Sequence, residues 1–290
     1  MRWHVSVPST PAQPRTTRID LKLLFTDLDG TLLNKESLIS QRTHGILKDF
    51  TEEGHLLIPN SGRPLLSIQK LTDSVGITDM VRYIVAYNGA LVWDCVKSEP
   101  VWSACVPMDC ARIIQDECTK LGIHIQTYNH ETIYTRRDEL EVTYYKKRIF
   151  LPVHFTDDPV GDLDEDPYKM LAIDLNDHEK LCKLRDNLAP LISDRINMVF
   201  SNDKYLEFFH KDAGKDRGIV ELCKLLNVPV SDSYAAGDEQ NDISMLQAAG
   251  CGIAVSNATD TVKAAADVIT ERDNDHDGLA EFILSSILAG

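Results

Sequence analysis

Acidic side chains gather at two places in the sequence, and each place follows a short apolar run. Asp27 and Asp29 come after the first run, and Asp238 and Asp242 come after a run near the other end of the chain. Carboxylates that converge on one edge of a sheet repel one another unless a cation lies among them. Hard carboxylate oxygens are ligands that Mg²⁺ favours. The aspartates therefore suggest a magnesium site.

Further polar groups follow two other apolar runs or begin an expected helix: Ser61-Gly62-Arg63, Asn88-Gly89 and Lys215. In an open parallel sheet, ligands bind beyond the carboxyl ends of the strands. A hydroxyl, an exposed glycine backbone and a lysine at that edge would suit a phosphate group. Together with the aspartates, they predict metal-assisted phosphoryl chemistry.

Each of these residues also has a structural explanation. The aspartates could be turn residues or could cap a helix N-terminus, and Ser61 could be an N-cap. Lys215 could be a surface charge, and Lys211 lies close by as a rival to it. Arg63 and Asn88 could brace loops. The functional interpretation rests on all of them occurring together.

The elements that would position these residues alternate between strand and helix. Short apolar runs predict strands at residues 23–25, 56–58, 83–86 and 233–236. Ser40 is an expected N-cap of a helix that stops near Gly54, and Pro64 is an expected first helical residue. Strand, helix, strand is the alternation of an α/β doubly wound sheet.

The middle of the chain has a different pattern. Strands are expected at 91–96, 101–106, 123–128, 132–135, 169–175, 195–201 and 205–209, with helices at 109–122, capped by Asp109, and 177–188. Hairpins with helices indicate an inserted α+β domain. The predicted organisation is a polar, disordered leader at 1–20, a core domain formed by 21–90 and 205–290, and a cap domain at 91–204.

Four motifs in order resemble the haloacid dehalogenase (HAD) superfamily, and in particular its Cof-type, class IIB sugar phosphatases. They are Asp27-Leu28-Asp29-Gly30-Thr31-Leu32-Leu33, Ser61-Gly62-Arg63-Pro64, Lys215 and the segment from Gly237 to Leu246. The resemblance covers the core, whereas the cap matches mainly in position and length. It implies a three-layer Rossmann-like parallel-sheet core with an inserted α+β cap of the C2B type. Ser61 departs from the threonine that relatives often have, but it keeps the hydroxyl.

The resemblance also implies roles. Asp27 would be the nucleophile, and Asp29 would protonate the leaving alcohol and then deprotonate water. The carboxylates of Asp27 and Asp238 and the backbone carbonyl of Asp29 would hold Mg²⁺, with Asp242 ordering a water or adding a ligand. Ser61 and Lys215 would bind the phosphoryl group. Residues on the substrate side would be Gly62, Arg63, Asn88, Gly89 and Asn241.

The predicted function is a Mg²⁺-dependent phosphatase that hydrolyses small phosphorylated metabolites, above all sugar phosphates, through an aspartyl-phosphate. Two alternatives stay open. One is a phosphomutase of the same superfamily, which would return the phosphoryl group to its product. The other is a non-catalytic protein that binds a phosphorylated ligand or regulates a partner; it would have no reason to keep Asp29.

Composition narrows the partners. The chain has 290 residues, with 45 acidic against 30 basic side chains and a net charge of −15. This balance disfavours nucleic acid and anionic membranes, and no apolar stretch is long enough to span a bilayer. Seven cysteines without a Cys-x-x-Cys pair indicate reduced thiols and a cytoplasmic location. We expect a monomer or a small homo-oligomer. The acid-poor first twenty residues leave a transit peptide as an alternative to the disordered leader.

Two acidic segments could suggest calcium. The stretch from Asp157 to Asp166 is more typical of a solvated loop. Asp273-Asn274-Asp275-His276-Asp277-Gly278 matches the start of an EF-hand loop, but its twelfth position is Leu284, where a glutamate is needed. We expect a capping loop there, with a helix beginning directly after Gly278.

Overall fold

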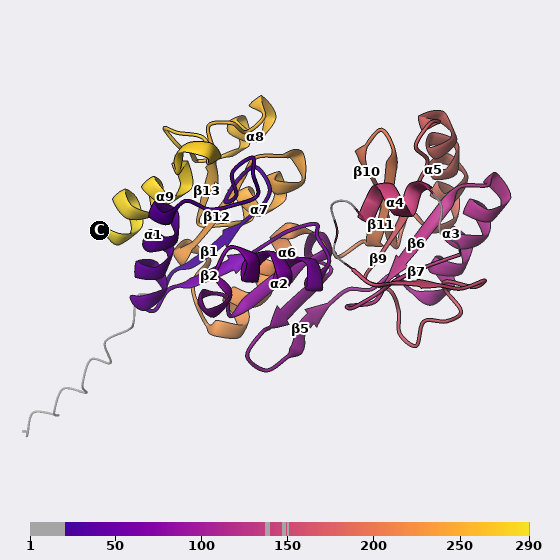
Figure 1. Ribbon diagram of the computed structural model, residues 1–290, viewed down its shortest axis with the longest axis horizontal. Helices are drawn as coiled ribbons and strands as arrows, with labels where there is room; N and C mark the ends of the chain where they lie inside the picture. Colours follow the sequence, from indigo (N-terminus) through magenta and orange to yellow (C-terminus); the bar gives the residue numbers. More distant parts are fainter. Residues whose placement is uncertain (1–20, 137–139, 147–148, 150, 290) are drawn as a thin grey trace, which may run out of the picture.

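The computed structural model describes residues 21–136, 140–146, 149 and 151–289, so the predicted leader lies outside the described residues. Two sheets dominate it and form two bodies that lie side by side (Figure 1). The core sheet is parallel throughout, and its strands run in the order β14 (Val268–Ile269), β13 (Cys251–Ala254), β12 (Ser233–Gly237), β1 (Leu23–Thr26) and β2 (Leu56–Pro59). The two central strands, β1 and β12, come from opposite ends of the chain.

The burial of β1 explains why its sequence is an uninterrupted apolar run. Leu23, Leu24 and Phe25 are all 0% exposed, so β1 is covered on both faces, as an apolar run in a parallel sheet requires. The helices of the core are α1 (Gln41–Glu52), α2 (Leu65–Ser74), α6 (Lys215–Leu226), α7 (Ile243–Ala248), α8 (Asp260–Ala265) and α9 (Gly278–Phe282). Single-turn or irregular helices are η1 (Thr78–Met80), η2 (Tyr87–Gly89), η3 (Val230–Asp232), η4 (Gln240–Asp242), η5 (Asn274–His276) and η6 (Ile283–Leu288).

The helix starts confirm one prediction and correct two. The Ser40 Oγ accepts a hydrogen bond from the Thr43 N–H at 2.9 Å, so Ser40 is the N-cap of α1. Pro64, predicted as the first helical residue, is the residue before α2, because its ψ of 150° is extended. Asp109, predicted as a cap, lies in the first turn of α3 (Met108–Leu121), which follows Pro107; its carboxylate pairs with Arg195 at 2.8 Å.

A small antiparallel sheet continues the core. It consists of β3 (Tyr83–Ala86), β4 (Leu91–Asp94) and β5 (Glu99–Ser103). Two isolated parallel bridges, from Leu57 to Val81 and from Asn60 to Val85, place β3 beside β2. Of the two strands expected at the start of the cap, β4 thus pairs with the third strand of the core, and β5 pairs with β4.

The second body is a six-stranded sheet with helices on one face. Its order is β10 (Ile196–Asn202), β11 (Tyr205–His210), β9 (Lys169–Ile173), β6 (His124–Tyr128), β7 (Ile133–Thr135) and β8 (Val153–Phe155). The helices α3 and α5 (His178–Ile192) pack on it. Gly122, at φ 63°, ends α3 as predicted. The sequence analysis contained neither α4 (Leu140–Lys146) nor β8, because both are short and β8 is largely exposed.

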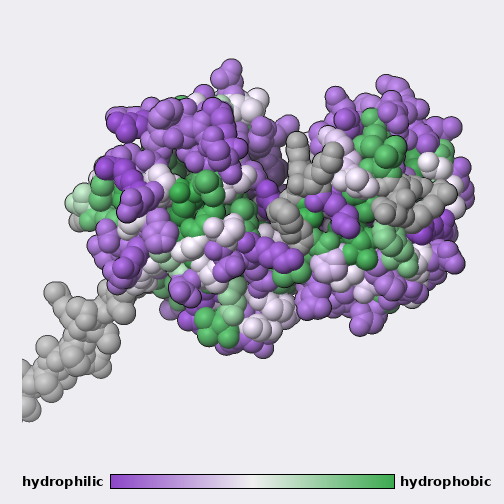
Figure 2. Space-filling model, viewed as in Figure 1, coloured by the Kyte–Doolittle hydropathy of each residue, from purple (hydrophilic) through white to green (hydrophobic). Residues whose placement is uncertain are grey.

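Alternation along the cap strands gives this sheet two apolar faces. Leu206 and Phe208 of β11 belong to the cluster beneath α3 and α5. Tyr205 and Phe209, on the opposite face of the same strand, belong to the core cluster together with Leu171 of β9. One face of the cap sheet therefore packs toward the core. Figure 2 shows the notch between the two bodies on one side.

These pairings bear on the predicted domain boundaries. β11, which the prediction assigns to the core segment 205–290, pairs with β9 and β10 in the cap sheet. The pairing of the strands favours boundaries after β5 and after β11. The boundaries themselves stay a prediction, while the α/β core with an inserted α+β unit is confirmed as the fold.

The acidic side chains of the loop before α9 form hydrogen bonds and an ion pair with other parts of the core. The Asp277 carboxylate accepts hydrogen bonds from the Ser40 hydroxyl at 2.5 Å and the Thr43 hydroxyl at 2.7 Å. Asp275 pairs with Lys35. The helix α9 begins at Gly278, which confirms the predicted helix after this loop.

Candidate active site

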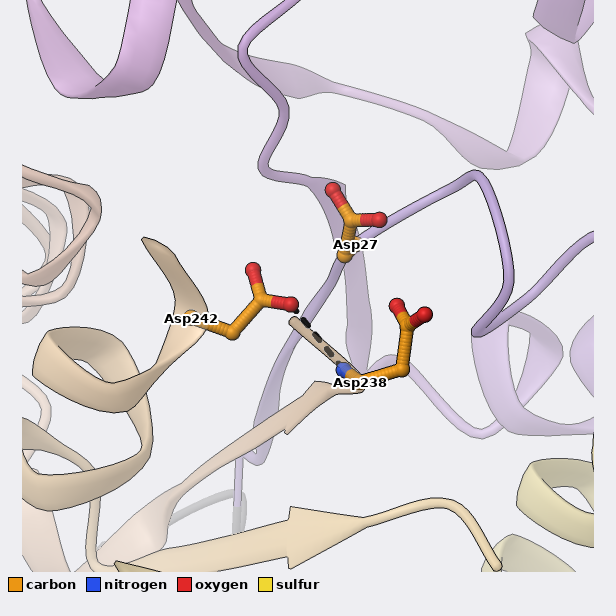
Figure 3. Close-up of side chains that lie close together, drawn as sticks. All are labelled: Asp27, Asp238 and Asp242. Atoms are coloured by element: carbon orange, nitrogen blue, oxygen red, sulfur yellow. Dashed lines mark hydrogen bonds between the residues drawn. The ribbon is translucent and has the colours of Figure 1, made fainter. Parts of the chain in front are cut away.

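Three of the predicted aspartates converge at the carboxyl edge of the core sheet. Asp27 follows β1, Asp238 follows β12 and Asp242 ends η4. An oxygen from each lies within 4.8 Å of the others, and Figure 3 shows the three side chains around one point. All three are buried, with 8%, 9% and 0% of their surfaces exposed, respectively. Parallel strands ending at one edge bring together residues that are more than 200 positions apart in the sequence.

Lys215 contacts this acidic group from the first turn of α6. Its Nζ lies 2.6 Å from Asp27 Oδ1 and 2.5 Å from Asp242 Oδ1, and the residue is 1% exposed. The rival Lys211 instead donates to the Ser193 carbonyl, outside the site. The structure thus brings Lys215, and not Lys211, to the aspartates.

The charges at this site are unbalanced, because three carboxylates face one ammonium group in the described part of the chain. Burial raises the pKa of Asp27 to about 7, as do Asp242 and Asp238, while Lys215 works against the rise. Burial likewise raises the pKa of Asp238 to about 6. For Lys215, burial lowers the pKa but Asp27 and Asp242 outweigh it, and the net shift is upward. A cation at this point would relieve the repulsion.

Hydrogen bonds hold two of the aspartates in place. The Asp242 Oδ2 accepts from the N–H groups of Asp238 and Glu239, both at 3.0 Å; the first of these bonds is dashed in Figure 3. Gly237 is required beside them, because a Cβ there would lie 2.3 Å from the Cβ of Asp242. Thr31, which the sequence analysis did not single out, donates to Asp238 Oδ1 at 2.7 Å. Its place two residues after Asp29 in the first motif was the available signal.

Asp29 does not join the three aspartates. Its two carboxylate oxygens accept from Arg63 Nε at 2.6 Å and Arg63 Nη2 at 2.7 Å, and its side chain is 51% exposed. The pair of residues predicted as the acid–base group and a substrate-side group therefore contact each other at the rim of the site. Arg63, and not a member of the acidic group, is therefore the partner of the Asp29 carboxylate.

Ser61 and Gly62 lie in the loop that follows β2, next to Arg63 and Asn88. Ser61 is 3% exposed, and its Oγ accepts from the Arg63 N–H at 3.2 Å. A Cβ at Gly62 would lie 2.8 Å from Asn88 Oδ1, so a glycine is needed for this close approach. The Ser61 N–H donates to the Val85 carbonyl of β3, which ties the loop to the neighbouring strand.

The turn after β3 has an unusual backbone. Tyr87, Asn88 and Gly89 all have positive φ, at 55°, 54° and 85°. Such conformations are costly for residues other than glycine and tend to occur at functional sites. At Gly89, a Cβ would lie 1.8 Å from the Gly214 carbonyl oxygen, so only glycine allows this turn to approach the start of α6.

Of two cap residues that the sequence analysis missed, Glu207 contacts this turn and Lys169 pairs with Glu207. Asn88 Nδ2 donates to Glu207 Oε2 at 3.2 Å, and the same oxygen pairs with Lys169 Nζ at 2.8 Å. Asn88 Oδ1 accepts from Asn241 Nδ2 at 3.3 Å. A carboxylate in the middle of the otherwise apolar strand β11 was a signal that could have revealed Glu207.

Comparisons with known proteins agree with this geometry. A family model for haloacid dehalogenase-like hydrolases matches residues 24–283. YxeH of Bacillus subtilis is 29% identical over 273 residues, covering 92% of this chain and 99% of YxeH. The 5-amino-6-(5-phospho-D-ribitylamino)uracil phosphatase YwtE of the same organism is 27% identical over 295 residues, covering 93% and 99%. The crystal structure of a haloacid dehalogenase-like hydrolase from Bacteroides thetaiotaomicron has a TM-score of 0.84 at 29% identity, covering 91% and 99%.

Within the described residues, no helix has the length and apolar character needed to cross a membrane. The match to the family spans the core and the cap alike, and it includes each strand end that carries an aspartate of the site. The chain therefore belongs to the haloacid dehalogenase-like hydrolases of the Cof type, and it is a phosphatase.

Proposed function

We propose that this phosphatase is Mg²⁺-dependent, that it acts on small phosphorylated metabolites with a polyol or sugar leaving group, and that Asp27 is its nucleophile. The observation that carries the proposal is the convergence of Asp27, Asp238 and Asp242 beside Lys215. A phosphate monoester brings further negative charge to a place where carboxylates already outnumber cations. Turnover there requires both the lysine and a bound cation.

The donor set fits magnesium. Asp27, Asp238 and Asp242 offer hard carboxylate oxygens within 4.8 Å of one another, which is the ligand type that Mg²⁺ selects. Asp27 and Asp238 would hold the ion directly, with Asp242 in support, since one Asp242 oxygen is already bound to backbone N–H groups. When bound, Mg²⁺ supplies charge neutralisation for the transferring phosphoryl group.

The residues of the chain can carry out two successive displacements. In the first, an Asp27 oxygen attacks phosphorus, the bond from phosphorus to the leaving oxygen breaks, and Asp29 donates a proton to that oxygen. In the second, Asp29 takes a proton from water, the water oxygen attacks phosphorus, and the bond to Asp27 breaks with release of phosphate. Asp29 alternates between acid and base, which its exposed position at the rim allows.

The groups around the phosphoryl position act by charge and orientation. Lys215 is fixed by two carboxylates and is ready to contact a phosphoryl oxygen. The Ser61 hydroxyl lies in the neighbouring loop, and Gly62 keeps that loop free of side chain. In phosphoryl transfer, positioning and electrostatic stabilisation supply most of the rate enhancement.

The relatives support the substrate class. YwtE is named for the phosphate ester of a ribityl chain, a polyol. No relative among those compared above is named as a mutase, so hydrolysis is favoured over return of the phosphoryl group to the product. A monomer or small homo-oligomer in the cytoplasm, with no nucleic-acid partner, remains the expectation from composition.

The test is phosphate release from a panel of sugar, polyol and nucleotide monophosphates with and without Mg²⁺, combined with acid quenching and mass spectrometry. We expect release from polyol or sugar esters only with the metal, and a phosphate on the peptide that contains Asp27. Turnover without any phosphorylated Asp27 peptide under rapid quench would refute the covalent route, and full activity in chelator would refute the metal requirement.

A further inference from the structure

We propose that Glu207 of the cap is a positioning residue that fixes the Asn88 amide so that its carbonyl oxygen accepts a hydrogen bond from a leaving-group hydroxyl. The inference rests on the proposed function and names what the site selects beyond the phosphate group.

Glu207 and Lys169 lie on the core-facing side of the cap sheet. Glu207 alternates with Leu206 and Phe208, which pack beneath the cap helices, so its side chain points the other way, as those of Tyr205 and Phe209 do. Glu207 is 8% exposed and Lys169 is 3% exposed. Their ion pair, at 2.8 Å, is thus buried between the cap and the core.

The charge of Glu207 decides which end of the Asn88 amide faces it. An ionised carboxylate can only accept hydrogen bonds, so the Asn88 group that contacts it is the NH₂. The two ends of an amide are otherwise interchangeable in shape, and their hydrogen-bond partners fix the orientation. Lys169 Nζ lies 2.8 Å from the same Glu207 oxygen, so that oxygen faces two N–H donors.

The other end of the amide is consequently an acceptor inside the site. Asn88 Oδ1 lies against Gly62 and accepts from Asn241 Nδ2 at 3.3 Å, so it sits between the two loops expected to surround the substrate. Asn88 is half-buried and Asn241 is exposed, so the oxygen borders the open side of the site. A carbonyl oxygen has two lone pairs, and the second is available for a ligand.

This acceptor discriminates between parts of a substrate. The oxygens of an ionised phosphate are acceptors and gain nothing from another oxygen. A hydroxyl of the leaving group can donate to it. The arrangement therefore favours esters that carry a hydroxyl near the phosphate, and it does so only while Glu207 holds the amide in this orientation.

The cap also holds the backbone on which Asn88 is presented. The hydroxyl of Tyr87 donates to the Asn129 carbonyl at 2.9 Å, and its ring stacks on Tyr168 at 5.4 Å between centroids. Both partners belong to the inserted segment. These contacts stabilise the positive φ of Tyr87 and Asn88, so the cap sets both the backbone and the side chain of this residue.

The experiment compares kcat/KM for glycerol 3-phosphate and propyl phosphate, which differ in the hydroxyls of the leaving group. One net hydrogen bond corresponds to a preference of about fivefold for the hydroxylated ester in the wild-type enzyme. The variant Glu207→Gln/Lys169→Met removes both charges, so the side-chain amide of Asn88 can rotate by 180°. We expect the ratio of kcat/KM for the two esters to fall to about 1 in this variant. Asn88→Gly tolerates the positive φ, lacks the acceptor and should give the same ratio.

The matched control is Asp174→Asn/Lys180→Met, which removes an ion pair just beyond the opposite end of β9. It should leave the wild-type ratio unchanged. The inference is overturned if the Glu207/Lys169 variant keeps the wild-type ratio, or if the control lowers the ratio equally. Should the Glu207/Lys169 variant fail to fold, Asn88→Gly decides, because an unchanged ratio there also overturns it.

The result separates this inference from the proposed function. A wild-type enzyme that releases phosphate from both esters with a ratio near 1 refutes the role of Asn88 and Glu207 alone. A wild-type enzyme that releases phosphate from no ester, p-nitrophenyl phosphate included, refutes the proposed function itself.

Discussion

The edge of the core sheet and the inner face of the cap sheet differ in the balance of their buried charges. In the core, Asp27, Asp238 and Asp242 are buried against a single lysine. In the cap, Glu207 and Lys169 form a pair of equal and opposite charges. A balanced pair can be held within one folded chain. An excess of buried carboxylates indicates a place where a ligand and a cation complete the structure.

The largest expected effect comes from removing the nucleophile. Asp27→Asn keeps the shape of the side chain but makes it a poor nucleophile, so we expect turnover to fall by a factor of about 10⁴ or more. Steady-state phosphate release measures it, with circular dichroism as the control for folding. Appreciable turnover in a folded variant would show that the unbalanced region is not where the covalent step takes place.

Metal removal should come next. Because the three carboxylates repel one another without a cation, we expect chelation to reduce activity by about 10³-fold and added Mg²⁺ to restore it. Activity is measured after dialysis against chelator and again after titration with Mg²⁺. If the dialysed protein retained its activity, the excess of carboxylates would need another explanation.

Asp29→Asn tests the rim of the same region. General acid–base catalysis contributes about 10² to 10⁴ in rate, so hydrolysis of a sugar phosphate should fall by that factor. An aryl phosphate needs less help to leave, but the aspartyl-phosphate would still lack its base. We expect a burst of aryl alcohol in stopped-flow measurements and then a slow steady state. If the burst and the steady state were lost equally for both substrates, Asp29 would be a structural residue.

Stability should respond in opposite directions in the two regions. Lys169→Met leaves the buried Glu207 unpaired and should lower the free energy of unfolding by about 3 to 5 kcal/mol. Urea denaturation with and without Glu207→Gln on the same chain measures the effect. A variant as stable as the wild type would mean that the pair is not as buried as the structure shows.

The smallest effect concerns Asp238 in metal-free protein. Folding raises the pKa of Asp238 from 3.8 to about 6. At a pH between these two values, the folded state therefore binds more protons than the unfolded state. The contribution of Asp238 to stability therefore declines as the pH rises from about 4 to about 6. Asp238→Asn should raise the thermal midpoint of the metal-free protein at pH 8 by a few degrees, roughly 2–4 °C per kcal/mol, and leave it unchanged near pH 3. A lower midpoint at pH 8 would contradict the idea of uncompensated charge.

Elements with local sequence signals could be predicted directly. An apolar run predicts the strand β1. Ser40 predicts the N-cap of α1, and Gly54 predicts that this helix ends close by. Gly122 predicts the end of α3. Three motifs after strands and Lys215 at a helix start, through their resemblance to the haloacid dehalogenase superfamily, were sufficient to predict the fold and to nominate Asp27, Asp238, Asp242 and Lys215. Strands of a parallel sheet present their carboxyl ends at one edge, which brings the aspartates together. Short elements without caps, such as α4 and β8, left no comparable signal.

The contacts between residues far apart in the sequence could be read only from the folded structure. It pairs Asp29 with Arg63, brings Thr31 to Asp238 and places Glu207 against Asn88, contacts that join residues 34, 207 and 119 positions apart. No local pattern specifies such distances, because they depend on how the cap sheet packs on the core and on which strand lies beside which. The convergence of the three aspartates could thus be predicted from residue types and spacing, while the orientation of Asn88 required the folded chain.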